Sequence, residues 1–188
     1  MAPATLRSPR LVLSVPDSAD VDAIHRALQD PEIARFTTIP FPYSHSDAEE
    51  FVARCTRQWE DGSNPRWALR HQGTLTGIVG LHGLDGSGTG EIGYWSTAAG
   101  RGHGFMTEAV TAVLDWGFAP EGAELHRVEW RAAVGNAASA RVARATGFRY
   151  EGTLRGALRN GYGERSDGWI AGLLAADPRT PSSWPIPI

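Results

Sequence analysis

The chain has 188 residues and a formal net charge of −3, with 41% hydrophobic and 21% charged residues. It is long enough for one substantial core, and its composition is that of an ordinary globular protein. The charge gives no indication of a nucleic-acid partner, and no apolar run reaches the roughly 18 residues that span a bilayer. All 18 basic residues are arginines, which excludes a P-loop lysine and a lysine Schiff base.

A single cysteine, Cys55, cannot form an internal disulfide and is typical of a reducing compartment. The first residues lack the charged and then apolar layout of a secretory signal. We therefore expect a cytoplasmic protein, a monomer or a homodimer, with neither a membrane nor a nucleic acid as partner. The six histidines have no metal-binding spacing, so no metal site is expected.

The first sixty residues predict a strand and two helices with a loop between them. The strand covers residues 11–15, and apolar residues at helical spacing follow the capping candidate Asp17. Residues 31–44 are rich in proline and aromatic residues and predict an irregular loop. The second helix begins near Ser46, carries a row of apolar residues on one face and ends at Gly62.

The rest of the chain predicts a β meander and then alternating helices and strands. A tight-turn sequence, Gln72-Gly73, predicts antiparallel pairing of the strands around it. Strands are expected at 66–71, 74–84, 91–96, 125–133, 148–153 and 167–174, and helices at 104–118 and 136–146. The prediction is an α+β fold with a single domain over residues 1–177, in which about four helices flank a mostly antiparallel mixed sheet. A proline-rich C-terminal tail, residues 178–188, is expected to be extended or loosely packed.

One segment combines glycines with a helix start. Residues 101–104 are Arg-Gly-His-Gly, directly before the third predicted helix. Two glycines spaced by one residue let a backbone approach a ligand closely, and the unpaired amides of a helix's first turn lie at the positive end of its dipole. This combination binds phosphate or pyrophosphate, although an ordinary strand-to-helix turn would have the same sequence features.

Two blocks of the sequence resemble a known family. Residues 91–95 and 101–109 are similar to motif A of the GCN5-related N-acetyltransferases (GNAT). Residues 136–152, with the pattern N-x-x-S-x-R-V, Gly-Phe and Glu-Gly, resemble the branch that contains RimJ and RimL. The likeness extends over essentially the whole chain up to about Leu174. It implies the GNAT fold and an N-acyltransferase that takes acetyl-CoA, or a related acyl-CoA, as its co-substrate.

The resemblance also implies which residues bind the co-substrate. Backbone amides of the glycine loop hold the pyrophosphate, and the strand before it hydrogen-bonds the pantetheine arm. Asn136 matches a contact near the pantetheine end. Ser139 matches a residue beside the thioester sulfur that can hydrogen-bond or protonate the departing thiolate, although a serine near a helix start also serves as a cap. The expected cofactor-binding residues are Tyr94, Trp95, Ser96, Arg101, Gly102, His103, Gly104, Phe105, Met106, Thr107, Asn136 and Ser139.

Acyl transfer to an amine also needs a proton acceptor, which typically contributes about 10²–10⁴-fold. Glu91 is the first candidate, because related acetyltransferases often place a base on this strand; a carboxylate paired with an arginine is the alternative. Glu129 and Asp167 are further candidates. The acidic residue that some RimL-like enzymes carry after this strand is absent from residues 96–99. A CoA-binding sensor or ligand-sequestering module with little catalysis is therefore the alternative function.

The amine acceptor is expected, from the resemblance, between the loop after the first helix and the segment before the last strand. The expected substrate-binding residues are Phe36, Phe41, Tyr43, Arg159 and Tyr162, with Trp59 as a further candidate. Aromatic residues with arginines suit an acceptor that has a ring or apolar part and some anionic or carbonyl groups, although packing of the loop would explain the same aromatics. Both the N-terminus of a protein and a small-molecule amine are candidate acceptors.

Overall fold

The computed structural model describes all 188 residues. The strands are β1 (Leu6–Arg7), β2 (Val12–Ser14), β3 (Arg66–His71), β4 (Thr74–His82), β5 (Thr89–Ser96), β6 (Arg127–Ala133), β7 (Arg149–Arg159) and β8 (Arg165–Leu174). The helices are α1 (Val21–Ala27), α2 (Pro31–Phe36), α3 (His45–Asp61), α4 (Phe105–Phe118) and α5 (Ala137–Ala145). The strands form one sheet in the order β1-β2-β3-β4-β5-β6-β8-β7, in which β5 and β6 alone are parallel. The expected α+β fold with a mostly antiparallel mixed sheet is confirmed.

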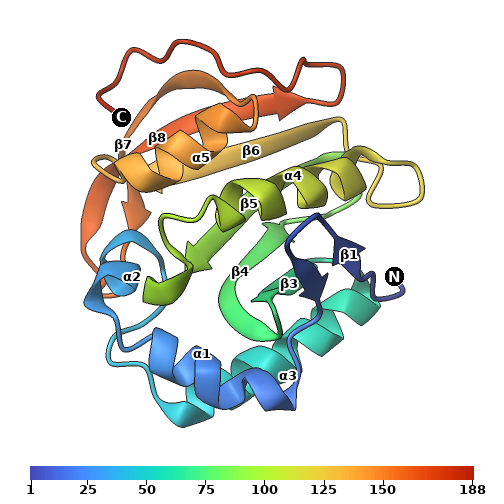
Figure 1. Ribbon diagram of the computed structural model, residues 1–188. Helices are drawn as coiled ribbons and strands as arrows, with labels where there is room; N and C mark the ends of the chain where they lie inside the picture. Colours follow the sequence, from blue (N-terminus) through green and yellow to red (C-terminus); the bar gives the residue numbers. More distant parts are fainter.

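Helices cover both faces of the sheet (Figure 1). The larger core cluster contains apolar residues of α4 and α5 packed on strand residues such as Val79 and Trp130. The smaller cluster contains residues of α1, α2 and α3 packed on Ile78 and Trp95. Alternation along each strand sends its side chains to the two faces in turn, so the sheet separates two layers of helices.

The predicted loop over residues 31–44 is wrong in its first half, which forms α2. The Asp30 side chain accepts a hydrogen bond from the Glu32 amide, and Pro31 occupies the first turn. Proline suits that position because the missing N–H has no partner there in any case. The later prolines of this segment masked a helix of only six residues.

Two other elements differ in extent from the prediction. α3 begins slightly earlier than expected, because Ser44 forms a capping box with Asp47. β7 continues to Arg159 instead of ending at 153, and it pairs antiparallel with β8 across two register shifts. Residues 154–159 were predicted to lie beyond the end of this strand, in the segment before the last strand; pairing with β8 makes them part of β7.

The proline-rich tail forms neither helix nor strand, but it packs closely on the domain. Trp184 is only 7% exposed and lies against the rings of Trp130 and Tyr150. Its indole N–H donates to the Phe148 carbonyl at 3.2 Å. The tail therefore contributes an aromatic residue to the main core. None of the helices combines the length and the apolar character that crossing a bilayer requires.

Candidate functional site: an acyl-CoA cleft and an acceptor cavity

The parallel strands β5 and β6 separate toward their carboxyl ends. Their pairing runs only from Thr89 opposite Arg127 to Ile92 opposite Trp130, although β5 continues to Ser96 and β6 to Ala133. The edge of residues 93–96 that faces β6 thus has no strand partner. An extended ligand can add to such an edge through backbone hydrogen bonds. Tyr94, Trp95 and Ser96, expected to bind pantetheine, lie on this edge.

The glycine loop after β5 presents backbone groups to solvent. Gly102 and Gly104 have φ angles of +79° and +74°, which glycine adopts at little cost. A Cβ atom on Gly102 would meet nothing within 4 Å. The first hydrogen bond of α4 runs from the Glu108 amide to the Gly104 carbonyl, so the amides of residues 105–107 have no intrahelical acceptor. These donors at the positive end of a helix suit a pyrophosphate.

Side chains of the same loop have other partners. The Arg101 guanidinium pairs with Asp30 at 2.7 Å and donates to the Ser96 carbonyl at 3.3 Å. The His103 ring stacks on Phe105 with centroids 5.3 Å apart. Phe105 and Met106 are buried in the core. The loop therefore offers a ligand its backbone, while its side chains hold it in place.

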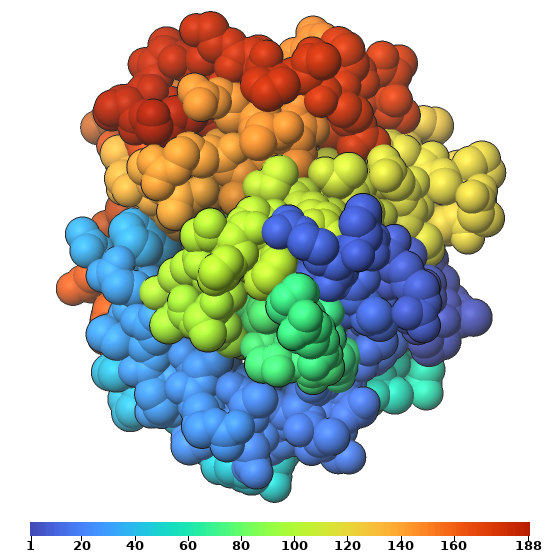
Figure 2. All heavy atoms as spheres, in the orientation of Figure 1, coloured from blue at the N-terminus to red at the C-terminus, as the bar shows by residue number.

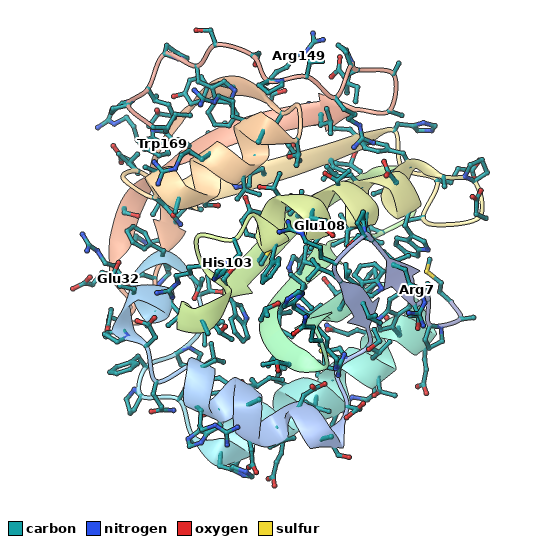
Figure 3. The ribbon with its side chains drawn as sticks, viewed as in Figure 1. Arg7, Glu32, His103, Glu108, Arg149 and Trp169 are labelled. Carbon is teal, nitrogen blue, oxygen red and sulfur yellow. The ribbon has the colours of Figure 1, made fainter.

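A carboxylate in the first turn of α4 anchors the loop to the N-terminal strands. Glu108 accepts hydrogen bonds from the Ser8 hydroxyl at 2.6 Å, from the Arg10 amide at 2.9 Å and from Arg10 Nε at 2.7 Å. Burial alone would raise the pKa of Glu108, but these hydrogen bonds hold it below its ordinary value. Arg10 also donates to the His103 carbonyl at 3.0 Å. Figure 3 labels His103 and Glu108, and Figure 2 shows the loop at the surface beside the N-terminal residues.

This anchor was not predicted from the sequence. The available signal was a charged residue in the first turn of an otherwise apolar helix, where a carboxylate interacts favourably with the dipole.

The hydroxyl of Ser139 lies in a closed hydrogen-bond network. It accepts from the Trp130 indole N–H at 3.0 Å and donates to the Tyr94 oxygen at 3.1 Å. The Tyr94 hydroxyl donates in turn to the Ser139 carbonyl at 3.0 Å, and burial raises the pKa of Tyr94. Asn136, not Ser139, caps α5, because its Oδ1 accepts from the Ser139 amide at 3.2 Å. The serine hydroxyl is thus free of capping and fixed in direction.

Glu91, Tyr94, Trp95, Asn136 and Ser139 line one cavity of about 460 Å³. Its other walls come from α2 and the segment after it, from α3, from the start of β3 and from the end of β7. The cavity is therefore lined both by residues expected to bind the acyl donor and by the candidate base Glu91. Its remaining walls leave room for an amine acceptor.

Of the three candidate bases, only Glu91 lines this cavity. Its side chain is 42% exposed and lies 3.6 Å from Arg131. Burial raises its pKa, Arg131 offsets part of this effect and Glu129 adds to it.

The other two carboxylates have structural partners. Glu129 pairs with Arg127 at 3.2 Å and with Arg131 at 2.8 Å. Burial would raise its pKa, but hydrogen bonds from these arginines lower it. Asp167 accepts from the Gly156 amide at 2.7 Å and so fixes the irregular part of β7. Neither carboxylate lines the cavity, and Glu129 is held by two arginines, so both are weaker candidates for the proton acceptor than Glu91.

The expected acceptor residues divide into two groups. Phe36, Tyr43 and Arg159 line the cavity. Phe41 and Tyr162 pack on each other edge to face, with ring centroids 5.5 Å apart, and are not part of its lining. They join the segment after α2 to the β7–β8 turn, where the Phe41 amide also donates to the Gly161 carbonyl. Trp59 is fully buried against Trp67 and Trp116, away from the cavity.

The cavity residues that were not anticipated from the sequence include Arg66 on β3 and His82 on β4. Arg66 Nη2 and His82 Nδ1 are 3.1 Å apart. Their neighbours on the sheet are glycines: a Cβ on Gly80 would lie 2.6 Å from Arg66 Cγ, and a Cβ on Gly93 would lie 2.7 Å from His82 Nε2. The two glycines thus make room for the arginine stem and the imidazole across the strands.

Comparison with known proteins gives the class of the chain. Residues 10–149 match the family model described as "Acetyltransferase (GNAT) domain", and the chain belongs to this family.

Similar proteins carry related names. "Putative ribosomal N-acetyltransferase YdaF" of Bacillus subtilis (strain 168) is 36% identical over 111 residues, which are 58% of this chain and 60% of that relative. The chain thus matches less than two thirds of YdaF. "Uncharacterized N-acetyltransferase p20" of Bacillus licheniformis is 27% identical over 80% of this chain and 85% of its own length.

Solved structures share the fold. A crystal structure described as "Probable acetyltransferase" has a TM-score of 0.82 at 28% identity and covers 93% of this chain and 98% of its own. RimL, a ribosomal L7/L12 alpha-N-protein acetyltransferase solved with coenzyme A, has a TM-score of 0.80 at 21% identity, with coverage of 91% and 98%. These matches confirm the expected GNAT fold, and the family model confirms the acetyltransferase class.

Proposed function

We propose that this protein transfers an acetyl or another short acyl group from acyl-CoA to a primary amine while both substrates are bound. One observation carries the proposal: Glu91, Ser139 and the free edge of β5 belong to the same cavity. Because YdaF is named as a ribosomal N-acetyltransferase, we take the N-terminal amine of a protein or peptide as the acceptor class. A small-molecule amine is the alternative acceptor.

Each group in the cleft has a proposed task. The amides of residues 102–107 hold the pyrophosphate, and the edge of residues 93–96 orients the thioester. Glu91 accepts the proton of the attacking amine as the new C–N bond forms and the C–S bond breaks. The Ser139 hydroxyl, which donates to Tyr94 in the free protein, turns to donate a hydrogen bond to the departing thiolate, and the proton taken up by Glu91 reaches that thiolate through solvent.

The cellular setting follows the sequence argument. We propose a cytoplasmic protein, because a single buried thiol, Cys55, is compatible with a reducing compartment. The choice between a monomer and a homodimer stays a prediction.

A thiol-release assay over a panel of peptides and small amines tests the proposal, with acetyl-, propionyl- and succinyl-CoA as donors. We expect release of the CoA thiol that depends on the amine, with one molecule of N-acylated product for each thiol. Tight CoA binding without thiol release for any amine would contradict the proposal and favour the CoA-binding module.

A further inference from the structure

The walls of the cavity carry an excess of positive charge. Its lining includes five arginines, Arg35, Arg54, Arg66, Arg131 and Arg159, but Glu91 is its only carboxylate. Three of these arginines already pair with a carboxylate: Arg35 pairs with Glu32, Arg54 with Glu50, and Arg131 with Glu129. Arg159 is exposed and donates to a carbonyl. Arg66 is the partly buried arginine whose charge no carboxylate balances.

Arg66 contacts neutral groups only. Its guanidinium donates to Gln58 Oε1 and to His82 Nδ1. Cys55 is buried beside it, but burial raises the pKa of this thiol to about 11, so the thiol carries no charge at neutral pH. Burial likewise raises the pKa of Tyr43, another cavity residue, to about 12. A partly buried guanidinium without a counter-ion is costly, and an anion at this place would lower that cost.

His82 adds a neutral donor next to this charge. A guanidinium can only donate, so His82 Nδ1 accepts and its hydrogen is on Nε2. Burial and the nearby Arg66 lower the pKa of His82 to about 4, so the ring stays neutral at physiological pH. Nε2 lies over Gly93, and His82 is directly opposite Glu91 in the sheet register. His82 is thus a sheet neighbour of the proposed base, and Arg66 adds a cation to the lining of the same cavity.

We propose that the acceptor carries a carboxylate or phosphate-type anion near its amine, and that Arg66, assisted by Arg54 and by His82 Nε2–H, binds this anion. The inference rests on the proposed function, because it assumes that the amine lies near Glu91. The guanidinium fork suits both anions, since it can donate two parallel hydrogen bonds to their oxygens.

Matched peptide amides test this inference without requiring turnover. Binding of Phe-Asp-NH₂ and Phe-Asn-NH₂, and of Phe-phosphoserine-NH₂ and Phe-Ser-NH₂, is measured by calorimetry on the protein saturated with CoA. The members of each pair have nearly the same α-amine and differ in the anion. We expect the anionic member to bind at least about 10-fold more tightly, as a charge-assisted hydrogen bond to a buried arginine would give. The pair of peptides with the larger ratio of affinities shows whether the carboxylate or the phosphate is the preferred anion.

Arg66→Met should bring these affinity ratios close to 1, whereas Arg66→Lys should retain part of the preference. Arg57→Met removes a charge from the exposed side of α3 and should leave the ratios unchanged. CoA affinity serves as the folding control, and Arg54→Met provides a second test if Arg66→Met does not fold. A purely structural role of Arg66 would lower both members of a pair equally.

Two outcomes would overturn the inference: equal binding within both pairs by the wild-type protein, or ratios that Arg66→Met does not change. Turnover of both members with equal kcat/KM would also overturn it and leave the proposed function standing. Selective binding of the anionic peptides with no thiol release would support it and contradict the proposed function.

Discussion

The proposed donor and acceptor parts of the site are built in different ways. The donor part is mainly backbone: the free edge of residues 93–96 and the loop of residues 101–107 come from one continuous segment. The acceptor part is made of side chains from separate elements, among them Phe36, Arg66 and His82. A backbone site recognises what all acyl-CoA molecules share, whereas a side-chain site can change with a few substitutions. The donor part thus indicates the family, and the acceptor part determines the individual substrate.

The largest expected effect is on the chemistry that connects the two parts. Glu91→Gln keeps the size of the side chain but removes the proton acceptor, so kcat should fall about 10²–10⁴-fold. CoA affinity should stay unchanged, because the donor part does not use Glu91. Steady-state kinetics and calorimetry measure the two quantities. Glu60→Gln, which alters an exposed carboxylate of α3 outside the cavity, serves as the control, and unchanged turnover in Glu91→Gln would remove Glu91 from the mechanism.

The pH profile sharpens the same assignment. Burial raises the pKa of Glu91, and a general base works only when it is deprotonated. The value of kcat should therefore fall as the pH decreases through this raised pKa, starting at a higher pH than an ordinary glutamate would give. In Glu91→Gln this decrease of kcat at low pH should disappear. A decrease that persists unchanged in the variant would show that it comes from protonation of the amine substrate.

A substitution in the loop should damage the donor part alone. Gly104 has a φ of +74°, and Gly104→Val would be strained there by about 1–3 kcal/mol, enough to weaken CoA binding by about 10- to 100-fold. Gly86→Val is a matched control, because Gly86 has a φ of +82° and an open environment outside the site. Both variants should lose stability, but only Gly104→Val should lose CoA affinity. Equal CoA affinity in the two variants would argue against the loop as the phosphate site.

A smaller effect is expected at the leaving group. Ser139→Ala removes one hydroxyl from a network that Tyr94 and Trp130 hold in place, and we expect kcat to fall about 10-fold, the size of one hydrogen bond. The decrease should shrink with an acyl donor whose thiol leaves more easily, because such a thiolate needs less stabilisation by a hydrogen bond. A loss of the same size for both donors would indicate a structural role of Ser139.

The smallest effect concerns stability. The pKa of His82 is lowered from 6.5 to about 4 in the folded protein, so the unfolded chain binds more protons between these values. The contribution of neutral His82 to the free energy of unfolding is therefore fully present above pH 6.5, and it is lost as the pH falls toward 4. His82→Gln should show a weaker decrease of Tm over this window in thermal unfolding. An identical decrease in both proteins would mean that other groups dominate the acid response.

Local sequence signals explain the correct predictions. Two correct predictions are the Gln72-Gly73 hairpin and the helix that ends at Gly62. Both depend on residues with left-handed φ angles, Gln72, Gly73 and Gly62, and on residues next to them in the sequence. The helix α2 was missed because its signals, Asp30 and Pro31, cover only two residues and stand before two further prolines. The strand character of residues 154–159 comes from pairing with β8, which no local pattern reports.

By itself, the sequence determined the family, and it predicted the phosphate loop and the roles of Glu91 and Ser139, because these signals depend on spacing within short segments. Tertiary structure alone decided that Glu91 and not Glu129 faces the cavity, that Phe41 and Tyr162 pack on each other, and that Arg66 lies beside His82. The physical reason is the distance along the chain. Strand pairing brings residues 66, 82 and 91 together, and the environment of a side chain depends on those neighbours.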